Sequence, residues 1–587
     1  MYSFAVIDFE TFFDTEYSLK RLTTEEYIRD PRFKIHCAAV VDSAGNKKVF
    51  TENFKENLAP YMDGFIIAQH SQCDGLILSH HLGLYPKYWG CTLSMARAQL
   101  QFLKSHSLSS LCTYFNLPEK TIDYNAFRGV RNLDTETLKM LTEGCLNDAV
   151  LTYNIANELL KTIPPQELRV IDLTIRMFTE PVLELDSARI KIELARVREN
   201  KSRALESLGV TKEDLQSAKK FSGLLEQLGV PVPMKISKTT GKEIPALAKT
   251  DEGMTELLNH ENELVAELAT ARLGQKSTLM ETRCERLLGM NERGPLPVYL
   301  KYHGAHTGRW SGGDKVNFQN LPRGSEIRKS IIAPSGYKLV GADSAQIECR
   351  MLNWFAGQHN IVEAFRTGRD IYCENASQFF ERQITKNDNN ERQFGKVIEL
   401  ASGYGCGYVK FKTISLQQAK KRLDDMESRK AINIYRNGHK NVVQAWYYFG
   451  EVLRNMGKNL PPYEYKCVTI DGYRIIMPGG TFLDYTGLRW DEEGNARIGD
   501  KKVYGGLVVE NIIQKLALIV VSEAIARIDD NYGYKLATTT HDDLLYVVPE
   551  DDTIALQNVL SEMKTPPEWC KDIPLGAEGF EGKRYDK

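Results

Sequence analysis

Residues 535–550 read KLATTTHDDLLYVVPE, two strand-like runs on either side of the adjacent acids Asp542 and Asp543. Thr, Leu, Tyr and Val favour strands, so the segment predicts a β-hairpin with the acids at or near its turn. Asp is a common turn residue, so two Asp residues at a hairpin tip need no functional explanation. The alternative is a divalent cation, which makes clustered carboxylates favourable and requires another acid on a second buried strand.

Asp343 supplies that acid, because it ends the apolar run YKLVGAD. The residues after it change to helical spacing, with Ile347, Met351 and Phe355 on one predicted face. Asp343 therefore lies at a predicted strand-to-helix junction, where a side chain can leave the core and face a cleft. An ordinary acid in the first turn of a helix would give the same pattern.

The segment ERQFGKVIELASGYGCG, residues 391–407, repeats functional side chains every four residues. On a helix, Arg392, Lys396, Leu400 and Tyr404 would lie along one face. Two cations suit a polyphosphate, and a flat ring suits a base. The alternative is a solvated charged face, which would not normally continue into Leu and Tyr.

A second acidic pattern lies near the N-terminus. In VIDFET, Asp8 and Glu10 are two residues apart on a predicted strand, so both carboxylates point to the same face. Asp74 in HSQCDGLIL and Asp148 in CLNDAVLTY would complete a site with four carboxylates and two metal ions. Each Asp alone has an equally good structural explanation, and the strand-borne pair is the stronger signal.

The length of 587 residues is too great for one core and predicts three or four domains. Hydrophobic content of 42% and charged content of 26% are typical of a soluble globular protein. We expect no transmembrane run, no signal peptide and no membrane partner. The 11 scattered cysteines indicate reduced thiols in a cytoplasmic protein. A net charge of −2 means that any basic footprint for nucleic acid is local.

The pattern of the chain changes twice. Residues 1–163 alternate strand-like and helical runs, which predicts an α/β domain, and residues 166–295 are mostly helical. A lysine-rich excursion at 229–251 interrupts this helical part and is either a solvated surface loop or an arm that follows phosphates. Its lysines are Lys235, Lys238, Lys242 and Lys249. From about residue 296 onward, strands and helices are mixed.

Taken together, these segments resemble the family A DNA polymerases in the form found in bacteriophages. DSAQIE is similar to motif A, R-x3-K-x7-Y-G to motif B, and HDD to motif C, whose usual form is His-Asp-Glu. The segments TGR with QNLPR, RDIYCENASQFF, DGYRIIMP, ENIIQ and SKTTGKEIPALAKTD also match. The resemblance covers essentially the whole chain, and the motifs follow the family's order.

The resemblance implies a multidomain fold of α/β and α+β type. An RNase H-like 3′–5′ exonuclease domain at 1–163 would precede a right-hand polymerase domain at 164–587. The thumb would lie at about 187–295, the fingers at about 346–470 and the palm in the remainder. The implied partners are primer–template DNA and dNTPs, and the implied location is the cytoplasm of an infected bacterium. We expect a monomer and leave accessory replication proteins open.

In the polymerase site, the resemblance implies that Asp343 and Asp542 bind two Mg²⁺ ions. Asp543 replaces the family's usual Glu and would have a supporting role. The residues implied to contact the incoming dNTP are Arg392, Lys396, Leu400, Tyr404, Glu348, Gln346 and Tyr372. Those implied to contact the primer terminus and the minor groove are Arg309, Gln514 and His541.

The roles of these residues also follow from the resemblance. Arg392 and Lys396 would hold the triphosphate, and Lys396 would protonate the leaving pyrophosphate. Tyr404 would stack at the template side of the new base pair. Glu348 matches the gate against a ribose 2′-hydroxyl, and Leu400 stands where cellular relatives carry Phe or Tyr, so sugar selection would depend more on Glu348. Tyr372 replaces a phosphate-contacting His of many relatives.

The N-terminal part resembles the DEDD exonucleases that proofread for family A polymerases. Asp8, Glu10, Asp74 and Asp148 would bind two Mg²⁺ ions. His70 replaces a common Asn, and Gly144 stands where the third motif expects Tyr. We therefore expect slow, metal-dependent excision that Gly144→Tyr accelerates, provided that the ring has space. The alternative is that Glu143 or Tyr153 already fills the gap.

Two other functions fit part of this sequence. A single-subunit phage RNA polymerase shares the right-hand architecture, but Glu348 and the fused exonuclease pattern argue against it. A catalytically silent replication scaffold would not need Asp343, Asp542, Arg392 and Lys396.

Overall fold

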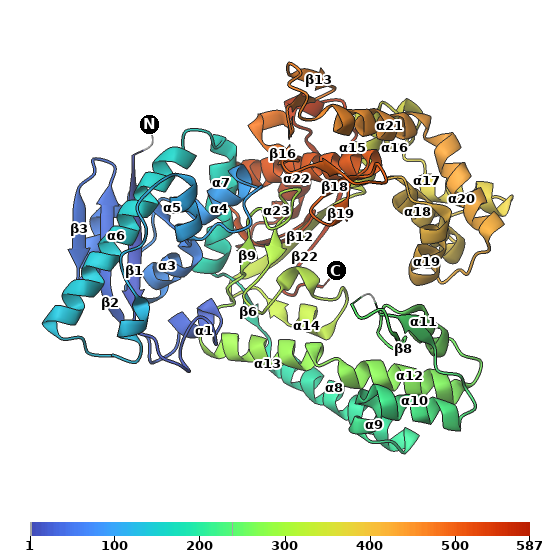
Figure 1. Cartoon of the computed structure of the whole chain (residues 1–587), viewed down its shortest axis with the longest axis horizontal. Helices are drawn as coiled ribbons and strands as arrows, with labels where there is room; N and C mark the ends of the chain where they lie inside the picture. Colours follow the sequence, from blue (N-terminus) through green and yellow to red (C-terminus); the bar gives the residue numbers. More distant parts are fainter. Residues whose placement is uncertain (1–2, 238, 587) are drawn as a thin grey trace. The chain divides into compact units, whose positions relative to one another are not determined.

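The computed structural model describes residues 3–237 and 239–586, and it divides into two compact units (Figure 1). Within the described residues, the first unit comprises 3–183, 297–320 and 333–583, and the second comprises 184–237, 239–296, 321–332 and 584–586. The predicted thumb, 187–295, falls within the second unit, whereas residues 1–163 share the first unit with most of the remaining chain.

The N-terminal part is built on a five-stranded mixed sheet in the order β3-β2-β1-β4-β5. Its strands are β1 (Phe4–Thr11), β2 (Ile35–Asp42), β3 (Lys47–Phe50), β4 (Phe65–Ala68) and β5 (Tyr88–Cys91). The central strand β1 runs antiparallel to β2 and parallel to β4. Its first four residues are buried, as expected for a strand with no solvent-facing side. The strand predicted at VIDFET is confirmed as part of β1.

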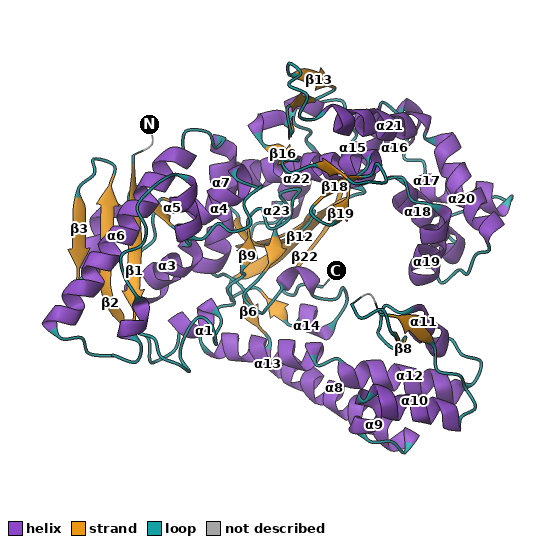
Figure 2. Ribbon diagram, viewed as in Figure 1, coloured by secondary structure: helices purple, strands orange, loops and turns teal. Residues whose placement is uncertain are grey.

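Helices cover this sheet (Figure 2). They are α1 (Thr24–Ile28), α2 (Phe54–Leu58), α3 (Ser71–Ile77), α4 (Thr92–Gln99), α5 (Leu108–Tyr114), α6 (Thr135–Leu159) and α7 (Pro165–Thr179). The long helix α6 packs on β1 and β2. It begins at Asp134, whose side chain accepts a hydrogen bond from the amide of Thr137 and so satisfies one free donor of the first turn.

The second large sheet of this unit has four antiparallel strands in the order β20-β21-β12-β22. They are β12 (Tyr337–Ser344), β20 (Lys535–Thr540), β21 (Asp543–Pro549) and β22 (Ala577–Gly582), and α23 (Ala555–Lys564) packs on β12 and β22. β20 and β21 form the predicted hairpin, with His541 and Asp542 in the turn. His541 has a φ of 60°, a left-handed conformation that suits a tight turn.

A helical region follows β12. It contains α15 (Ile347–Ala356), α16 (His359–Arg366), α17 (Ile371–Phe380), α18 (Asn389–Ser402), α19 (Tyr408–Ala419), α20 (Asp425–Gly438) and α21 (Lys440–Asn455). Ile347, Met351 and Phe355 are buried, which confirms the predicted face of α15. Phe394 of α18 packs with Phe411 and Tyr435 in the core of this region, and that packing fixes which face of α18 remains outside.

The longest helix is α22 (Gly505–Tyr532). We expected no segment long and apolar enough to span a membrane. Judged by length and composition alone, this expectation was wrong. Among the described residues, α22 alone satisfies both criteria. However, 72% of its most apolar window is buried inside the protein, as in the core helix of a folded domain. α22 packs along α21, α15 and α7.

Short strands complete the first unit. They are β9 (Leu300–Lys301), β10 (Ser311–Gly312), β13 (Tyr463–Tyr465), β14 (Val468–Asp471), β15 (Arg474–Ile476), β16 (Phe482–Asp484), β17 (Arg489–Trp490), β18 (Ala496–Ile498) and β19 (Lys501–Lys502). β14 and β15 form a hairpin whose turn lies in the segment DGYRIIMP.

The second unit is mostly helical, as predicted for residues 166–295. Its helices are α8 (Ser187–Leu208), α9 (Lys212–Gln216), α10 (Ala218–Gln227), α11 (Glu252–Leu258), α12 (Glu263–Lys276), α13 (Leu279–Glu292) and α14 (Glu326–Lys329), and its strands are β6 (Glu184–Leu185), β7 (Met234–Ile236), β8 (Glu243–Pro245) and β11 (Ile331–Ile332). The lysine-rich segment is a hairpin of β7 and β8 instead of an irregular loop. Lys235 pairs with Asp251 at 2.6 Å, and Lys238 lies outside the described residues.

Candidate active sites

The acids of the four-stranded sheet meet at one end of it. Asp343, near the end of β12, pairs in register with Asp543, the first residue of β21. The amide of Ser344 donates to the carbonyl of Asp542 over 3.1 Å, so the hairpin turn lies beside Asp343. Burial and the charge of Asp343 raise the pKa of Asp542 to about 7. Such a rise is the physical sign of two carboxylates close together in a partly dry site.

A second cluster centres on Glu348, in the first turn of α15. Arg309 donates a hydrogen bond to Glu348, and the hydroxyl of Tyr404 lies 3.5 Å from its Oε2. Burial and Glu348 together raise the pKa of Tyr404 and also that of Glu510 on α22. Residues that the resemblance assigns to primer, sugar and template contacts are thus brought together from three distant segments.

Tyr404 does not lie on the same helix as Arg392, contrary to the sequence-based expectation. α18 ends at Ser402, and Gly405 has a φ of 82°. Gly in this conformation is a common way to end a helix, so the glycines around Tyr404 were the missed signal. The face predicted for the other three residues holds, because all three lie on α18, with Leu400 exposed and Lys396 partly exposed.

Arg392 is held in place by a residue that the sequence analysis did not single out. Its Nε donates to Oδ2 of Asp370 over 2.8 Å. Asp370 caps α17, where its side chain accepts hydrogen bonds from the amides of Tyr372 and Cys373. The signal was present as an Asp immediately before a helical run. One carboxylate therefore links the start of α17 to the basic face of α18.

Gln346 and Tyr372 also meet. Gln346 precedes α15 in a left-handed conformation, with a φ of 57°, and it shares a side-chain hydrogen bond with Tyr372. The guanidinium carbon of Arg392 lies 5.5 Å from the centre of the Tyr372 ring, within the range of a cation–π contact. Tyr372 is thus a buried neighbour of the basic face, with raised pKa because of its burial.

The last two predicted primer contacts lie close to this cluster. Gln514 on α22 donates to Glu510 over 3.2 Å, and Glu510 is near enough to Arg309 for that charge to affect its pKa. Burial and the charge of Arg309 lower the pKa of His541, so His541 favours its neutral form. Gln514 therefore contacts Glu510, a neighbour of the Arg309–Glu348 pair. His541 lies close enough to Arg309 for that charge to affect its pKa.

Beneath α18 lies a buried polar cluster around Glu399 that the sequence analysis missed. Oε2 of Glu399 accepts from Asn375 over 2.8 Å, its Oε1 accepts from Cys349 over 3.2 Å, and His439 Nε2 is also 3.2 Å from Oε1. Burial alone would raise the pKa of Glu399, but His439 and the hydrogen bonds hold it below its ordinary value. The cluster joins α18 to α15, α17 and the residue that precedes α21.

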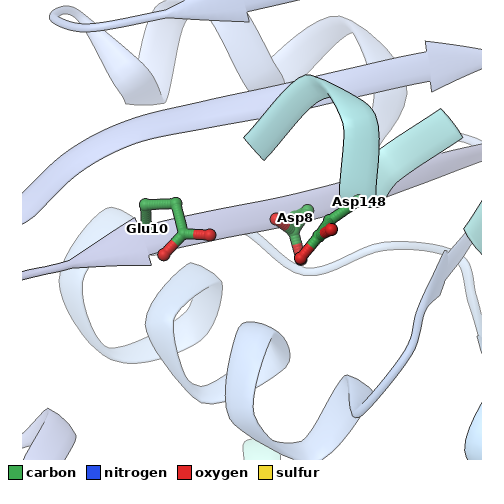
Figure 3. A group of neighbouring side chains, drawn as sticks. All are labelled: Asp8, Glu10 and Asp148. Carbon is green, nitrogen blue, oxygen red and sulfur yellow. The ribbon is translucent and has the colours of Figure 1, made fainter. Parts of the chain in front are cut away.

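Three of the predicted N-terminal acids form one group (Figure 3). Asp8 and Glu10 project from β1 and Asp148 from α6, and ligand oxygens of all three lie within 4.8 Å of one another. Among the described residues, this is the one group of three or more such side chains at metal-ligating distance. The prediction that these carboxylates converge is confirmed for these three.

Asp74 completes the acidic set from α3. Its carboxylate accepts a hydrogen bond from the amide of Phe9 on β1, and its charge helps to raise the pKa of Asp8. Burial raises the pKa of Asp74 to about 7 and that of Glu10 to about 8. For Asp8, burial and then the charge of Glu10 act in the same direction. Raised pKa values on neighbouring acids, as for Asp8, Glu10 and Asp74, are a common feature of functional sites.

The segment before α6 adds two side chains to this group that the sequence analysis did not predict. The hydroxyl of Tyr124 donates to Oδ2 of Asp148 over 2.9 Å. Nζ of Lys120 lies 2.5 Å from the same oxygen. The contacts join residues that are 24 and 28 positions apart, so no local spacing pattern could reveal them.

The position of Gly144 differs from what the resemblance suggested. A Cβ atom on Gly144 would lie 2.5 Å from Cδ1 of Ile122 and 3.0 Å from its Cβ, so a tyrosine there has no space. The condition that the ring has space is not met, so Gly144→Tyr is not expected to accelerate excision. Neither proposed substitute fills the gap: Glu143 is exposed, and the hydroxyl of Tyr153 bonds to the carbonyl of Ser43.

The four-stranded sheet with its acids, the Arg392–Lys396 face and the Glu348 cluster are the features expected of a nucleotidyltransferase site. Residues 183–458 match the family model described as DNA polymerase family A. A DNA polymerase of Bacillus phage SP02 is 26% identical over 584 residues, which cover 86% of this chain and 87% of that protein. The chain is a DNA-directed DNA polymerase, and its residues 183–458 are similar to DNA polymerase family A.

A bacterial relative matches a shorter part of the chain, and a solved structure matches most of it. DNA polymerase I of Helicobacter pylori strain J99 is 29% identical over 295 residues, 48% of this chain and 29% of that protein. The solved structure of the POL domain of Pol1 from M. smegmatis, in complex with DNA primer-template and dNTP, has a TM-score of 0.72 at 17% identity. It covers 94% of each chain, and at this identity the likeness concerns the fold.

Proposed function

We propose that this polymerase adds dNTPs to a primer 3′-hydroxyl by two-metal phosphoryl transfer. We further propose that residues 1–163 excise mismatched 3′ nucleotides. The observation that carries the polymerase part is the meeting of Asp343 and Asp542 at the end of the four-stranded sheet. The phage relative that spans most of the chain supports a role in phage-type DNA replication.

The residues present fit divalent cations. Carboxylate oxygens are the ligands that Mg²⁺ prefers, and rigid strands hold them in fixed positions. Asp343 and Asp542 would hold two Mg²⁺ ions, with Asp543 supporting their position from the start of β21. When bound, the ions supply activation of the 3′-hydroxyl and stabilisation of charge on the triphosphate. The raised pKa of Asp542 reflects a repulsion that a cation would relieve.

The basic face of α18 would hold the triphosphate. Arg392 is already oriented by Asp370, so little side-chain freedom is lost when a phosphate binds. Lys396, one turn further along α18, would bind the same group and donate a proton to the departing pyrophosphate. Leu400 and Tyr404 would contact the base pair, and the Tyr404 hydroxyl is anchored near Glu348.

Arg309, Gln514 and His541 would contact the primer terminus and the minor groove. All correct base pairs present acceptors there, so donors at fixed positions test pair geometry without reading sequence. In this proposal, residues 187–295 act as the thumb, residues 346–470 as the fingers and the remaining polymerase residues as the palm. Gln346 and Tyr372 support the dNTP site through their mutual hydrogen bond.

The N-terminal acids would form a second metal site. Asp8, Glu10, Asp74 and Asp148 offer an all-oxygen donor set in a buried position, which fits two Mg²⁺ ions. The complex named for the M. smegmatis relative supports primer–template DNA and dNTPs as partners of this chain. We further propose that it acts as a monomer in the cytoplasm of an infected bacterium.

Primer extension on a DNA template tests the polymerase proposal. The protein is offered dNTPs or rNTPs, with Mg²⁺ or with a chelator. We expect extension with dNTPs and Mg²⁺ only. Extension with rNTPs and no primer would indicate an RNA polymerase, and DNA binding without any extension would indicate a scaffold.

Glu348→Ala is expected to raise ribonucleotide use relative to deoxyribonucleotide use by about tenfold to a hundredfold. The reason is that Glu348 would occupy the space of a 2′-hydroxyl, and Leu400 presents no ring as a second barrier. Because Arg309 loses its partner, dNTP use also falls, so the measured quantity is the ratio of kcat/KM values. Glu363→Ala, at an exposed position on α16, is the control. An unchanged ratio in Glu348→Ala would place the gate elsewhere.

Mg²⁺ is expected to raise the melting temperature more at pH 8 than at pH 6. The folded pKa values of about 8 for Glu10 and about 7 for Asp74 and Asp542 exceed their ordinary values. Without metal, the folded state therefore binds more protons than the unfolded state between about pH 4 and pH 8, and stability falls as pH rises through this window. Bound Mg²⁺ favours the ionised carboxylates and offsets that loss at pH 8.

Thermal unfolding with and without Mg²⁺ at both pH values measures this effect. The double variant Asp8→Asn, Asp542→Asn is expected to lose most of the Mg²⁺-dependent difference between pH 8 and pH 6. An equal Mg²⁺ effect at both pH values in the unmodified protein would contradict the prediction.

A further inference from the structure

A second segment of the chain contacts the N-terminal acidic group at Asp148. This segment, residues 117–128, ends in the short 3-10 turn η3 (Tyr124–Phe127). The Tyr124 hydroxyl donates to Oδ2 of Asp148 over 2.9 Å and also shares a hydrogen bond with Glu10. A single hydroxyl thus lies between a carboxylate of β1 and a carboxylate of α6, inside the acidic group.

Two further side chains of this segment, Lys120 and Ile122, fix it in this position. Nζ of Lys120 pairs with Oδ2 of Asp148 and lies 5.0 Å from the centre of the Tyr124 ring. Ile122, between these two residues, packs directly over Gly144, where a Cβ would come within 2.5 Å of Cδ1 of Ile122. Ile122 therefore occupies the space that a side chain at position 144 would need.

We propose that Tyr124 orients the water that attacks the terminal phosphodiester, in place of the tyrosine that related exonucleases carry at the position of Gly144. This inference rests on the proposed exonuclease function. The hydroxyl reaches the acidic group from a loop instead of from α6, and Gly144 is what allows that loop to approach. Gly144 and Tyr124 are then two parts of one arrangement, and Gly144 is not a defect.

The reaction has a simple balance. The water oxygen forms a bond to phosphorus, and the bond from phosphorus to the 3′ oxygen of the preceding nucleotide breaks. The terminal nucleotide leaves as a 5′-monophosphate, and the 3′ oxygen takes a proton as water loses one. Tyr124 keeps its own proton. Its hydroxyl accepts from or donates to the water, so its part is orientation, which typically contributes about 10² to 10⁴ in rate.

The neighbouring hydroxyl and imidazole groups do not offer the same role. Tyr153 bonds to the carbonyl of Ser43, and its ring packs against Phe4. His70 bonds to the hydroxyl of Tyr299 over 2.8 Å. Of these three side chains, Tyr124 alone contacts the acids that form the group.

The first test compares single-turnover removal of a 3′ mismatch by the full chain and by Tyr124→Phe, Tyr153→Phe and Asp8→Ala. Tyr124→Phe keeps the ring and its contact with Lys120 and removes only the hydroxyl. We expect it to slow excision by about 10² or more. Tyr153→Phe, which removes a hydroxyl away from the acids, should excise at the unmodified rate, and Asp8→Ala should not excise.

Two further measurements separate orientation from disruption of the site. Mn²⁺ binding, followed by electron paramagnetic resonance, and affinity for a single-stranded oligonucleotide in Ca²⁺ should change less than about twofold in Tyr124→Phe, because the carboxylates are unchanged. Primer extension should also be unchanged, which shows that the chain is folded. Loss of Mn²⁺ binding together with excision would mean that Tyr124 only maintains the metal site, and would overturn the proposal.

The second test changes the packing without touching the hydroxyl. Gly144→Ala forces Ile122 away and should slow excision at least tenfold, whereas Gly144→Ala with Ile122→Ala restores space and should recover most of the rate. If Gly144→Ala excises at the unmodified rate, the packing argument fails. If Asp8→Ala abolishes excision but Tyr124→Phe stays within threefold of the unmodified chain, the role of Tyr124 is wrong while the exonuclease remains. Excision that survives in Asp8→Ala would instead remove the proposed site itself.

Discussion

Asp542→Asn is expected to lower the rate of primer extension by at least about 10³ while mismatch excision continues. Removing one group that stabilises a transition state costs about 10² to 10³ in rate, and a shared metal ligand should cost at least that. The substitution keeps the size of the side chain but removes the charge that a cation needs. The same result is expected for Asp343→Asn, because Asp343 lies beside Asp542 across the sheet.

The measurement is single-turnover nucleotide addition on a matched primer–template, with excision of a 3′ mismatch measured on the same preparations. Asp551→Asn is a suitable control, because Asp551 is an exposed acid in the segment just after β21. Asp543→Asn should give an intermediate loss, in agreement with a supporting role. Extension within tenfold of the unmodified rate by Asp542→Asn would remove the proposed polymerase metal site.

Lys396→Ala is expected to lower the maximal rate of nucleotide addition by about 10² to 10³, since a positioned proton donor contributes roughly 10² to 10⁴. Lys396 lies one turn from Arg392 on α18, so both cations would face the phosphate groups of a bound dNTP. Loss of binding alone would raise the half-saturating dNTP concentration. Loss of the proton donor lowers the maximal rate, and we expect the second effect to be larger.

Rapid-quench measurements over a range of dNTP concentrations separate these effects. Lys396→Arg should bind dNTP well but recover little of the rate, because a guanidinium does not release its proton at neutral pH. The control Lys386→Ala removes an exposed lysine just before α18. A change in dNTP affinity with an unchanged maximal rate would limit Lys396 to binding.

Much of the fold follows from short-range patterns. The strand that ends in Asp343 and the hairpin that carries Asp542 were predictable, because apolar runs and turn residues are local signals. The helix break before Tyr404 was also signalled locally, by glycines on both sides of it, but the spacing of four was given too much weight. The lysine-rich hairpin of β7 and β8 was not predicted, because its sequence has no clear alternation of apolar and polar residues.

The residues missed at the two sites share a different cause. The contact of Asp370 with Arg392 joins positions 22 apart, and that of Tyr124 with Asp148 joins positions 24 apart. Neither follows a helix or strand period, so only the folded chain brings them together. Gly144 shows the same limit, because its effect depends on Ile122, a residue in a different segment.

The register of β12 and β21 restricts how this sheet can change in evolution. Successive side chains of a strand alternate between its two faces, so shifting one strand by a single residue moves its whole set of side chains to the wrong face. A one-residue insertion between Asp343 and the middle of β12, or a corresponding deletion in β21, would separate Asp343 from the hairpin that carries Asp542. Changes in length at the opposite ends, around Tyr337 and Pro549, leave that pairing intact. Length variation among homologous chains should therefore accumulate at that end of the sheet and be rare at the end that holds the acids.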